Sequence, residues 1–176
     1  MKRLLLIIAM LALQSLFANV FAEEWGPLTN GVQTSVKMWT GHAQITTNET
    51  VLLQFQIRNT TTNETFYFRW WATFENSFSY MVISPSGEKL SQRSDAIIAG
   101  SSGPIPIRSN DTHEYNLDLN KLYKFDELGT YKITVKAVLV SESSLLSHGK
   151  KTFWGDGDEA FEVTSNPLLV TVVSKK

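Results

Sequence analysis

Few side chains in this sequence have the types and spacing that catalytic chemistry requires. The chain has three histidines and no cysteine, and His42, His113 and His148 each stand alone in polar sequence. No H-E-x-x-H or G-x-S-x-G pattern occurs, and no glycine loop of the kind that binds phosphate or a dinucleotide. Without cysteine there is no thiol nucleophile, thiolate metal site or disulfide. We therefore expect a protein that is not an enzyme and needs no cofactor.

One acidic segment has the side chains that a cation could use. In FWGDGDEAFE, residues 153–162, Asp156, Asp158 and Glu159 surround two glycines. Carboxylate oxygens on a glycine-bearing loop suit Ca²⁺, although the segment lacks the ligand run and closing glutamate of an EF-hand. The favoured alternative is a solvated acidic turn that joins two late strands.

An aromatic segment, FYFRWW at residues 66–71, is a second candidate site. If Tyr67 and Trp71 are exposed with Arg69 between them, they form a platform that stacks on sugars or packs against a protein. The favoured alternative is that these rings belong to the core of the fold.

The N-terminus has the three parts of a secretory signal peptide. Basic Lys2 and Arg3 precede an apolar stretch at residues 4–13, and small residues precede a cleavage site after Ala22. We expect an exported protein, periplasmic or secreted, whose residues 23–176 form a single domain with no membrane span. Loss of two of the 16 basic residues leaves no surplus over the 17 acidic ones, so nucleic acid is not an expected partner. An exported domain without cysteine is more typical of bacteria than of animals.

Alternation of apolar and polar residues recurs along the mature chain and indicates strands. Seven segments have this character: 32–39, 50–59, 65–74, 78–84, 114–119, 129–140 and 166–173. Turn signals separate them, including the Gly/Ser/Pro-rich segment AGSSGPIP at residues 99–106. Seven or eight strands at this spacing predict an all-β, immunoglobulin-like antiparallel β-sandwich.

The segment FDELGTYKITVKA, residues 125–137, indicates how the two sheets are connected. Tyr131 follows Gly129 by two residues and begins an alternating strand. In immunoglobulin-like sandwiches a tyrosine at this place bonds through its hydroxyl to backbone a few residues upstream, which is called a tyrosine corner. We predict such a corner at Tyr131, with Gly129 allowing the tight approach.

Hydrophobic packing is expected to replace the disulfide that antibody domains place behind this corner. Two residues after the tyrosine, Ile133 occupies the cysteine position, and we expect it to pack against Leu53 or Phe55. Trp70 or Trp71 would be the core tryptophan of the third strand. Counting in step with the two phenylalanines of that strand predicts a buried Trp70 and an outward-facing Trp71.

Two stretches resemble immunoglobulin-like sandwiches of exported bacterial proteins. In HEYNLDLNKLYKFDELGTYKITV, residues 113–135, a polar strand ends in an L-D-L step, a turn follows, and G-T-Y begins the next strand. The strand, turn and aromatic strand of VLLQFQIRNTTTNETFYF, residues 51–68, are similar in outline to the bacterial intracellular proteinase inhibitor domain. The N-terminal sandwich of deuterolysin-type metalloproteases is also similar. The resemblance implies a fold and leaves the function open, because such sandwiches host unrelated activities.

Three functions follow from these observations. The first is a module that binds another protein, with proteinase inhibition as one form of it. GSSGPIPIRSN, residues 100–110, would then be the inhibitory loop, stiffened by two prolines and anchored by Arg108, although it could merely connect strands. The second is a carbohydrate-binding module that uses the exposed aromatic side chains. The third is a structural subunit of the cell envelope that completes its sheet with a partner's strand, which a long edge without proline or lysine would favour.

Overall fold

The computed structural model describes residues 24–71, 75–93, 101–147 and 160–175, and for 69–71, 101–102 and 147 it describes the backbone alone. The predicted signal peptide, residues 1–22, lies outside the described residues. So does the acidic segment with Asp156, Asp158 and Glu159. The cleavage site and the calcium site therefore stay predictions.

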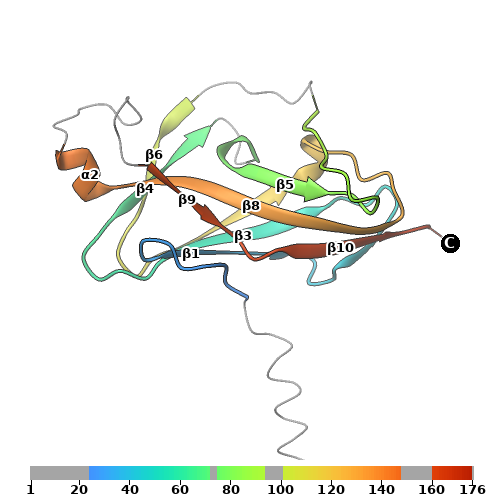
Figure 1. Ribbon diagram of the computed structural model, residues 1–176, viewed down its shortest axis with the longest axis horizontal. Helices are drawn as coiled ribbons and strands as arrows, with labels where there is room; N and C mark the ends of the chain where they lie inside the picture. Colours follow the sequence, from blue (N-terminus) through green and yellow to red (C-terminus); the bar gives the residue numbers. More distant parts are fainter. Residues whose placement is uncertain (1–23, 72–74, 94–100, 148–159, 176) are drawn as a thin grey trace, which may run out of the picture.

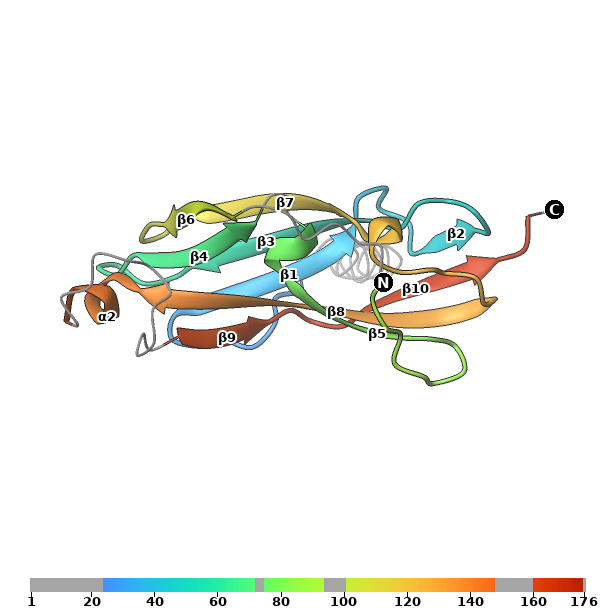
Figure 2. The same ribbon diagram turned by 90° about the horizontal axis from the view of Figure 1, so that it is seen from above.

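Two β-sheets pack face to face, as Figure 1 and Figure 2 show from two directions. The smaller sheet has three antiparallel strands in the order β1-β3-β7. Their bounds are β1 (Val32–Met38), β3 (Leu52–Asn59) and β7 (Thr112–Asp118).

The larger sheet is built around one long strand, β8 (Gly129–Ser141), which runs through the middle of Figure 1. One side of β8 pairs with β9 (Ala160–Thr164) and β10 (Leu168–Val173), and the other side pairs with β4 (Phe66–Trp71) and β5 (Ser79–Ile83). Beyond these lie β6 (Ser101–Ile107) beside β4, and the three-residue β2 (Gln44–Thr46) parallel to β10. The remaining elements are short helices: η1 (Glu75–Ser77), η2 (Leu119–Lys121) and α2 (Glu142–Ser147).

The predicted immunoglobulin-like sandwich is confirmed, and each of the seven predicted strands is present. The described residues form ten strands rather than the seven or eight predicted, because β2, β6 and β9 were not expected. The most important correction concerns residues 99–106, which were predicted as a turn region. Residues 101–107 form β6, paired in antiparallel register with β4.

The core lies between the sheets and uses the alternation seen in the sequence. Leu53, Phe55 and Ile57 of β3 are fully buried, and Ile133 of β8 is buried in the same cluster from the opposite sheet. This arrangement agrees with the expectation that apolar side chains fill the place of the antibody disulfide. At about 25 cal/mol per Å² of apolar surface, burying each such side chain stabilises the fold by about 1.5–3 kcal/mol.

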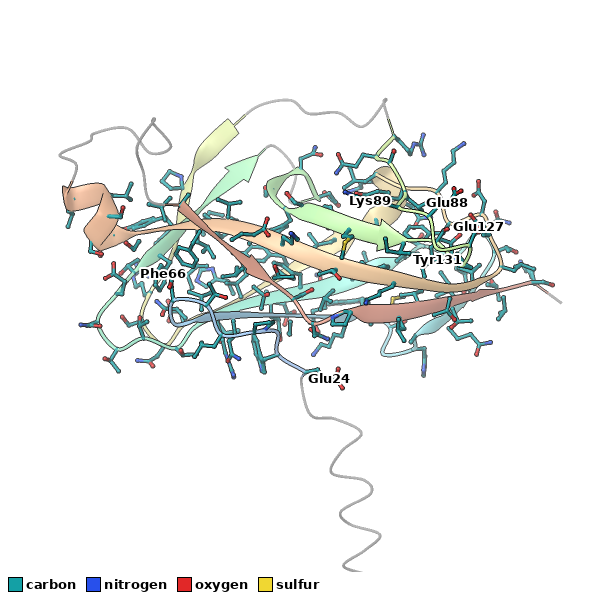
Figure 3. All side chains as sticks on the ribbon, in the orientation of Figure 1. Glu24, Phe66, Glu88, Lys89, Glu127 and Tyr131 are labelled. Atoms are coloured by element: carbon teal, nitrogen blue, oxygen red, sulfur yellow. The ribbon has the colours of Figure 1, made fainter. Side chains whose placement is uncertain are left out.

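The tyrosine corner is present. The Tyr131 hydroxyl accepts a hydrogen bond from the backbone N–H of Glu127, with an N–O distance of 2.8 Å, and the Tyr131 side chain is 1% exposed. Figure 3 shows both residues at one end of β8. Gly129 has φ of 126°, and a Cβ there would lie 2.8 Å from the Cβ of Pro85, so no larger residue fits without rearrangement. The corner therefore depends on both the tyrosine and the glycine.

The predicted burial of Trp70 stays a prediction, because its side chain lies outside the described residues. The register between β4 and β6 shifts between Arg69 and Trp71. The alternation of inward and outward side chains that Phe66 and Phe68 define need not continue past this irregularity. It therefore does not determine which of the two tryptophans is buried.

Candidate functional site

The outer strands of the two sheets are the places where a second chain could extend the fold. Within the described residues these strands are β1 and β7 of the smaller sheet, β2 and β6 at the ends of the larger one, and β5 and β9, each of which pairs with β8 alone. Each edge strand exposes backbone N–H and C=O groups on its outer side unless something covers or removes them. These edges differ in how their outer backbone groups are covered. On β5 the N–H of Leu90 donates to the Val82 carbonyl at 2.9 Å, and β9 has five residues.

The β1 edge is covered by other parts of the chain. The backbone N–H of Gly26 donates to the carbonyl of Thr34 at 2.7 Å. The N–H of Val36 donates to Asn166 Oδ1 at 3.1 Å. At the far edge of the other sheet, β2 has three residues, a length that gives little room for a partner strand.

The β6 edge lacks hydrogen-bond donors at two positions because both are prolines. In antiparallel strands the backbone groups of successive residues point to opposite sides. Glu142 N–H donates to the Thr65 carbonyl on the β8 side of β4, so the even-numbered residues of β4 face β6, where Phe66 lies opposite Ile107. The even-numbered residues of β6 therefore point their backbone outward. These include Pro104 and Pro106, which have no N–H.

The β7 edge has outward donors and no proline or lysine. Two backbone bonds at the ends of the β3–β7 ladder set the alternation: Asn59 N–H to the Asp111 carbonyl at 2.9 Å, and Leu119 N–H to the Val51 carbonyl at 3.0 Å. Odd-numbered residues of β7 therefore face β3. The even-numbered ones face outward: Thr112, Glu114, Asn116 and Asp118.

One of these four outward amides is already occupied. The N–H of Asp118 donates to Glu75 Oε1 at 3.3 Å, and the same oxygen accepts a hydrogen bond from Lys121 Nζ at 2.8 Å. Burial acts to raise the pKa of Glu75, but the bonds from Lys121 and from the backbone outweigh it and leave the pKa below its ordinary value. Glu75 therefore closes one end of the edge. No described residue pairs with the backbone of Thr112, Glu114 or Asn116 on the outer side.

The outer face of the smaller sheet holds the Glu114 carboxylate in place. Ser35, Gln56 and Glu114 are neighbours across β1, β3 and β7. Ser35 Oγ donates to Gln56 Oε1, and Gln56 Nε2 donates to Glu114 Oε2, each at 3.1 Å. Ser35 and Gln56 are buried although they lie on an outer face, whereas Glu114 is exposed. The bond from Gln56 reduces the freedom that Glu114 would lose on binding a cation.

The cations nearest to this edge already have partners. Arg58 lies opposite Thr112, but its Nη2 donates to Gln33 Oε1 at 2.6 Å, and its guanidinium lies 4.0 Å from the centre of the Trp25 ring. Lys121 binds Glu75. The β7 edge therefore presents the negative charges of Glu114 and Asp118 without a lysine or arginine on the strand, while nearby Asp111 lies 4.0 Å from Nε2 of His113.

The predicted aromatic platform is described in part. Tyr67 is half-buried, and its hydroxyl donates to Glu142 Oε1 of α2 at 3.2 Å. Burial and the Glu142 charge raise the pKa of Tyr67 above its ordinary value, and the opposite charge of Arg108 reduces this rise. The side chains of Arg69 and Trp71 lie outside the described residues. A sugar-stacking surface here stays a prediction.

The candidate inhibitory loop is corrected by the structure. Residues 101–107 of the segment 100–110 are the paired strand β6, so they do not project as a loop. Arg108 is exposed at the following turn, which is closed by a bond from Asp111 N–H to the Arg108 carbonyl at 3.0 Å. The glycine, serine and proline content that indicated a loop belongs to an edge strand.

A hollow of about 640 Å³ lies beside β5. It is lined by aromatic and polar side chains: Asn76, Phe78, Ser79, Tyr80, Ser91, Gln92 and Tyr123, with Leu90 and Lys89. Burial raises the pKa of Tyr80 well above its ordinary value. Lys89 is the one charged side chain in this lining, so the hollow offers no acid–base pair of carboxylates or histidines.

The described residues contain neither a cluster of metal ligands nor a membrane-spanning helix. No group of three or more histidine, aspartate or glutamate side chains there is close enough to hold a metal ion. No helix in the same part of the chain has the length and apolar character needed to cross a bilayer.

No family model and no curated protein matches the sequence. Among solved structures, the chain is similar to an X-ray structure of Northeast Structural Genomics Consortium target SoR45, with a TM-score of 0.45 and 13% identity over 83% of this chain and 90% of that chain. It is also similar to the ASH/PapD-like domain of human CEP192 (PapD-like domain 7), with a TM-score of 0.38 and 10% identity over 85% of this chain and 90% of that one. These likenesses concern the fold and carry no statement about function.

Proposed function

We propose that this protein is an exported, non-enzymatic β-sandwich module that binds another protein by accepting an extended strand of that protein at β7. Export is inferred from the signal-peptide pattern of residues 1–22. The observation that carries the binding proposal is the outer side of β7, where Thr112, Glu114 and Asn116 have no backbone partner among the described residues.

An open edge without proline or lysine is a hazard for a monomer, because it pairs with any exposed strand. The same property makes it a recognition site when a partner supplies an extended segment, since main-chain hydrogen bonds then give much of the affinity. The contrast with the other edges supports a role for this one. β1 is covered, β2 is short, β6 has prolines at outward positions, and β5 accepts a bond from the Leu90 N–H. β9 has five residues, whereas β7 has seven and keeps its donors.

The other candidate functions have weaker support. Carbohydrate binding would need Tyr67 as an open stacking face, but this ring is half-buried and its hydroxyl is bonded to Glu142. Proteinase inhibition would need a projecting loop at 100–110, where β6 lies instead. A structural role in the envelope is also compatible with strand addition. It differs from the proposal in that the complex with the partner would be permanent.

The proposal is tested with a pair of variants at Asn116. Asn116→Pro removes one outward N–H and takes no bond from the β3 ladder, because the backbone of Asn116 faces away from β3. Asn116→Thr changes the side chain and keeps the N–H. Mature wild-type protein and both variants are immobilised and exposed to the envelope fraction of the source cells, and retained proteins are quantified.

We expect wild type and Asn116→Thr to retain the same partner, and Asn116→Pro to retain at least about tenfold less. In the purified complex, amide hydrogen exchange should slow at Thr112, Glu114 and Asn116, the three amides that a new strand would cover. Equal retention by Asn116→Pro, unchanged exchange at these amides or the absence of any retained protein would each contradict the proposal.

A further inference from the structure

We infer that the strand accepted at β7 is basic, with lysine or arginine at alternate positions that lie on the same face of the sheet as Glu114. This inference rests on the proposed function and adds the chemistry of the partner. It follows from the charges, the fixed position of Glu114 and the length of open edge.

The outer side of β7 carries negative charge and has no lysine or arginine. Glu114 and Asp118 lie on β7, whereas the carboxylate of Asp111, just before the strand, lies 4.0 Å from Nε2 of His113. Arg58 and Lys121, the neighbouring cations, are bound by Gln33 and Glu75. An incoming acidic strand would place like charges side by side, which destabilises cross-strand pairs, whereas a basic strand forms favourable ones.

The Glu114 carboxylate is positioned to receive such a cation. Its Oε2 is held by Gln56 Nε2, which is in turn oriented by the buried Ser35, and no hydrogen bond of Oε1 is found among the described residues. A lysine or arginine opposite Glu114 would have its Cβ about 4.5–5.5 Å from that of Glu114, within easy reach of the carboxylate. Because the acceptor is already oriented, less conformational freedom is lost on binding.

The register is limited by Glu75. This side chain occupies the N–H of Asp118, so the free outward donors run from Thr112 to Asn116. A partner strand centred on Glu114 would pair with those residues and place its next outward side chain diagonal to Glu114, within reach of a long basic side chain. Its alternate, inward-facing side chains would lie beside the buried Tyr115 and Leu117, where apolar residues fit.

The same charges argue against a second copy of this chain as the occupant. Antiparallel pairing of two β7 strands would bring the carboxylates of Glu114 and Asp118 from both copies onto one face, without a lysine or arginine on either strand. The partner is therefore an extended basic segment of another protein.

Two synthetic peptides test the inference with the full mature protein. Each has seven residues with blocked ends and valine at alternate positions; one has lysine and the other glutamate at the three positions between. Backbone amide resonances are followed by NMR during titration at low and at physiological salt, which both locates the binding and measures weak affinity.

We expect the lysine peptide to shift Thr112, Glu114 and Asn116 and to bind at least about tenfold more tightly than the glutamate peptide at low salt, with a smaller difference at physiological salt. Glu114→Gln should weaken the lysine peptide by about two- to fivefold. The matched control Glu88→Gln, at an exposed turn far along the chain from β7, should leave the affinity unchanged.

The outcomes separate this inference from the proposed function. Equal binding of both peptides at the three amides, abolished by Asn116→Pro, would overturn the basic partner and leave strand addition standing. If neither Glu114→Gln nor Asn116→Pro changes the affinity for the lysine peptide, the peptide binds at another site and the inference is overturned. The inference is also overturned if neither peptide binds, or if sedimentation shows that the protein without peptide dimerises through β7. In either case the capture experiment with Asn116→Pro tests the proposed function independently.

Discussion

The strands β6 and β7 are seven residues long, follow one another in the chain and lie along the same side of the sandwich (Figure 2), yet their outer edges are opposites. The outward positions of β6 include Pro104 and Pro106, which cannot donate a hydrogen bond. The outward positions of β7 keep their N–H groups, and Glu75 occupies the last of them.

The difference between the edges of β6 and β7 indicates that edge protection is specified separately for each strand. A protein under selection only for solubility would be expected to protect both neighbouring edges by similar means. Here one edge is protected by proline, and the other carries a fixed carboxylate beside backbone donors that have no partner in the described part of the chain. This difference between the two edges is the reason why we propose binding at β7 rather than at the sandwich as a whole.

The largest expected effect tests which backbone groups of β7 face outward. Leu117→Pro removes an N–H that faces β3 and replaces a side chain that is fully buried, so it should lower the free energy of unfolding by about 3 kcal/mol or more. Asn116→Pro, one residue away, should lower it by about 1 kcal/mol or less, because its N–H faces outward. Urea denaturation followed by tryptophan fluorescence measures both. Similar losses for the two variants would refute the alternation on which the comparison depends.

Local sequence patterns were sufficient for the parts of the fold that repeat a local rule. Alternation predicted β3 and β8, and the spacing of Gly129 and Tyr131 predicted the corner, because the hydrogen bond to Glu127 spans only four residues. These features need no knowledge of distant segments.

The candidate site could not be predicted in the same way. Residues 114–119 were predicted as a strand, but whether a strand lies at an edge is decided by the pairing of distant segments. The sequence of β6 predicts a turn, because glycine, serine and proline are typical of loops. Proline is tolerated there because the N–H at positions 104 and 106 would face outward, which is a property of the tertiary fold. The absence of proline and lysine in THEYNLD was visible in the sequence and acquired meaning only with the strand order.

A smaller effect is expected where β7 is closed by Glu75. Glu75→Gln removes the charge that binds Lys121 and should lower the free energy of unfolding by about 1–2 kcal/mol at neutral pH, since Lys121 is partly exposed. The pKa of Glu75 is lowered in the folded protein from an ordinary value of 4.5, so its contribution is present above that value and is lost as the pH falls through the folded pKa. The difference between wild type and Glu75→Gln should therefore shrink in acid. Thermal unfolding measured between pH 7 and pH 3 checks this, and a difference that grows as the pH falls would contradict it.

We expect the smallest effect on stability from the double variant Pro104→Val and Pro106→Val. This variant also gives the β6 edge the property that distinguishes β7, namely outward N–H donors. Both prolines lie at outward positions, so valine restores two N–H donors to the β6 edge and should change the free energy of unfolding by about 1 kcal/mol or less. The new open edge should make the protein associate as its concentration rises, which size-exclusion chromatography with light scattering detects.

Tyr131→Phe is the control for the double variant, because it removes the bond to Glu127 N–H and should cost about 1 kcal/mol without altering either edge. If the control associates as strongly as the double variant, association reports lost stability and not an opened edge. If the double variant stays monomeric, the prolines are not what protects β6. The difference between β6 and β7 would then need another physical cause, such as the charges carried by their side chains.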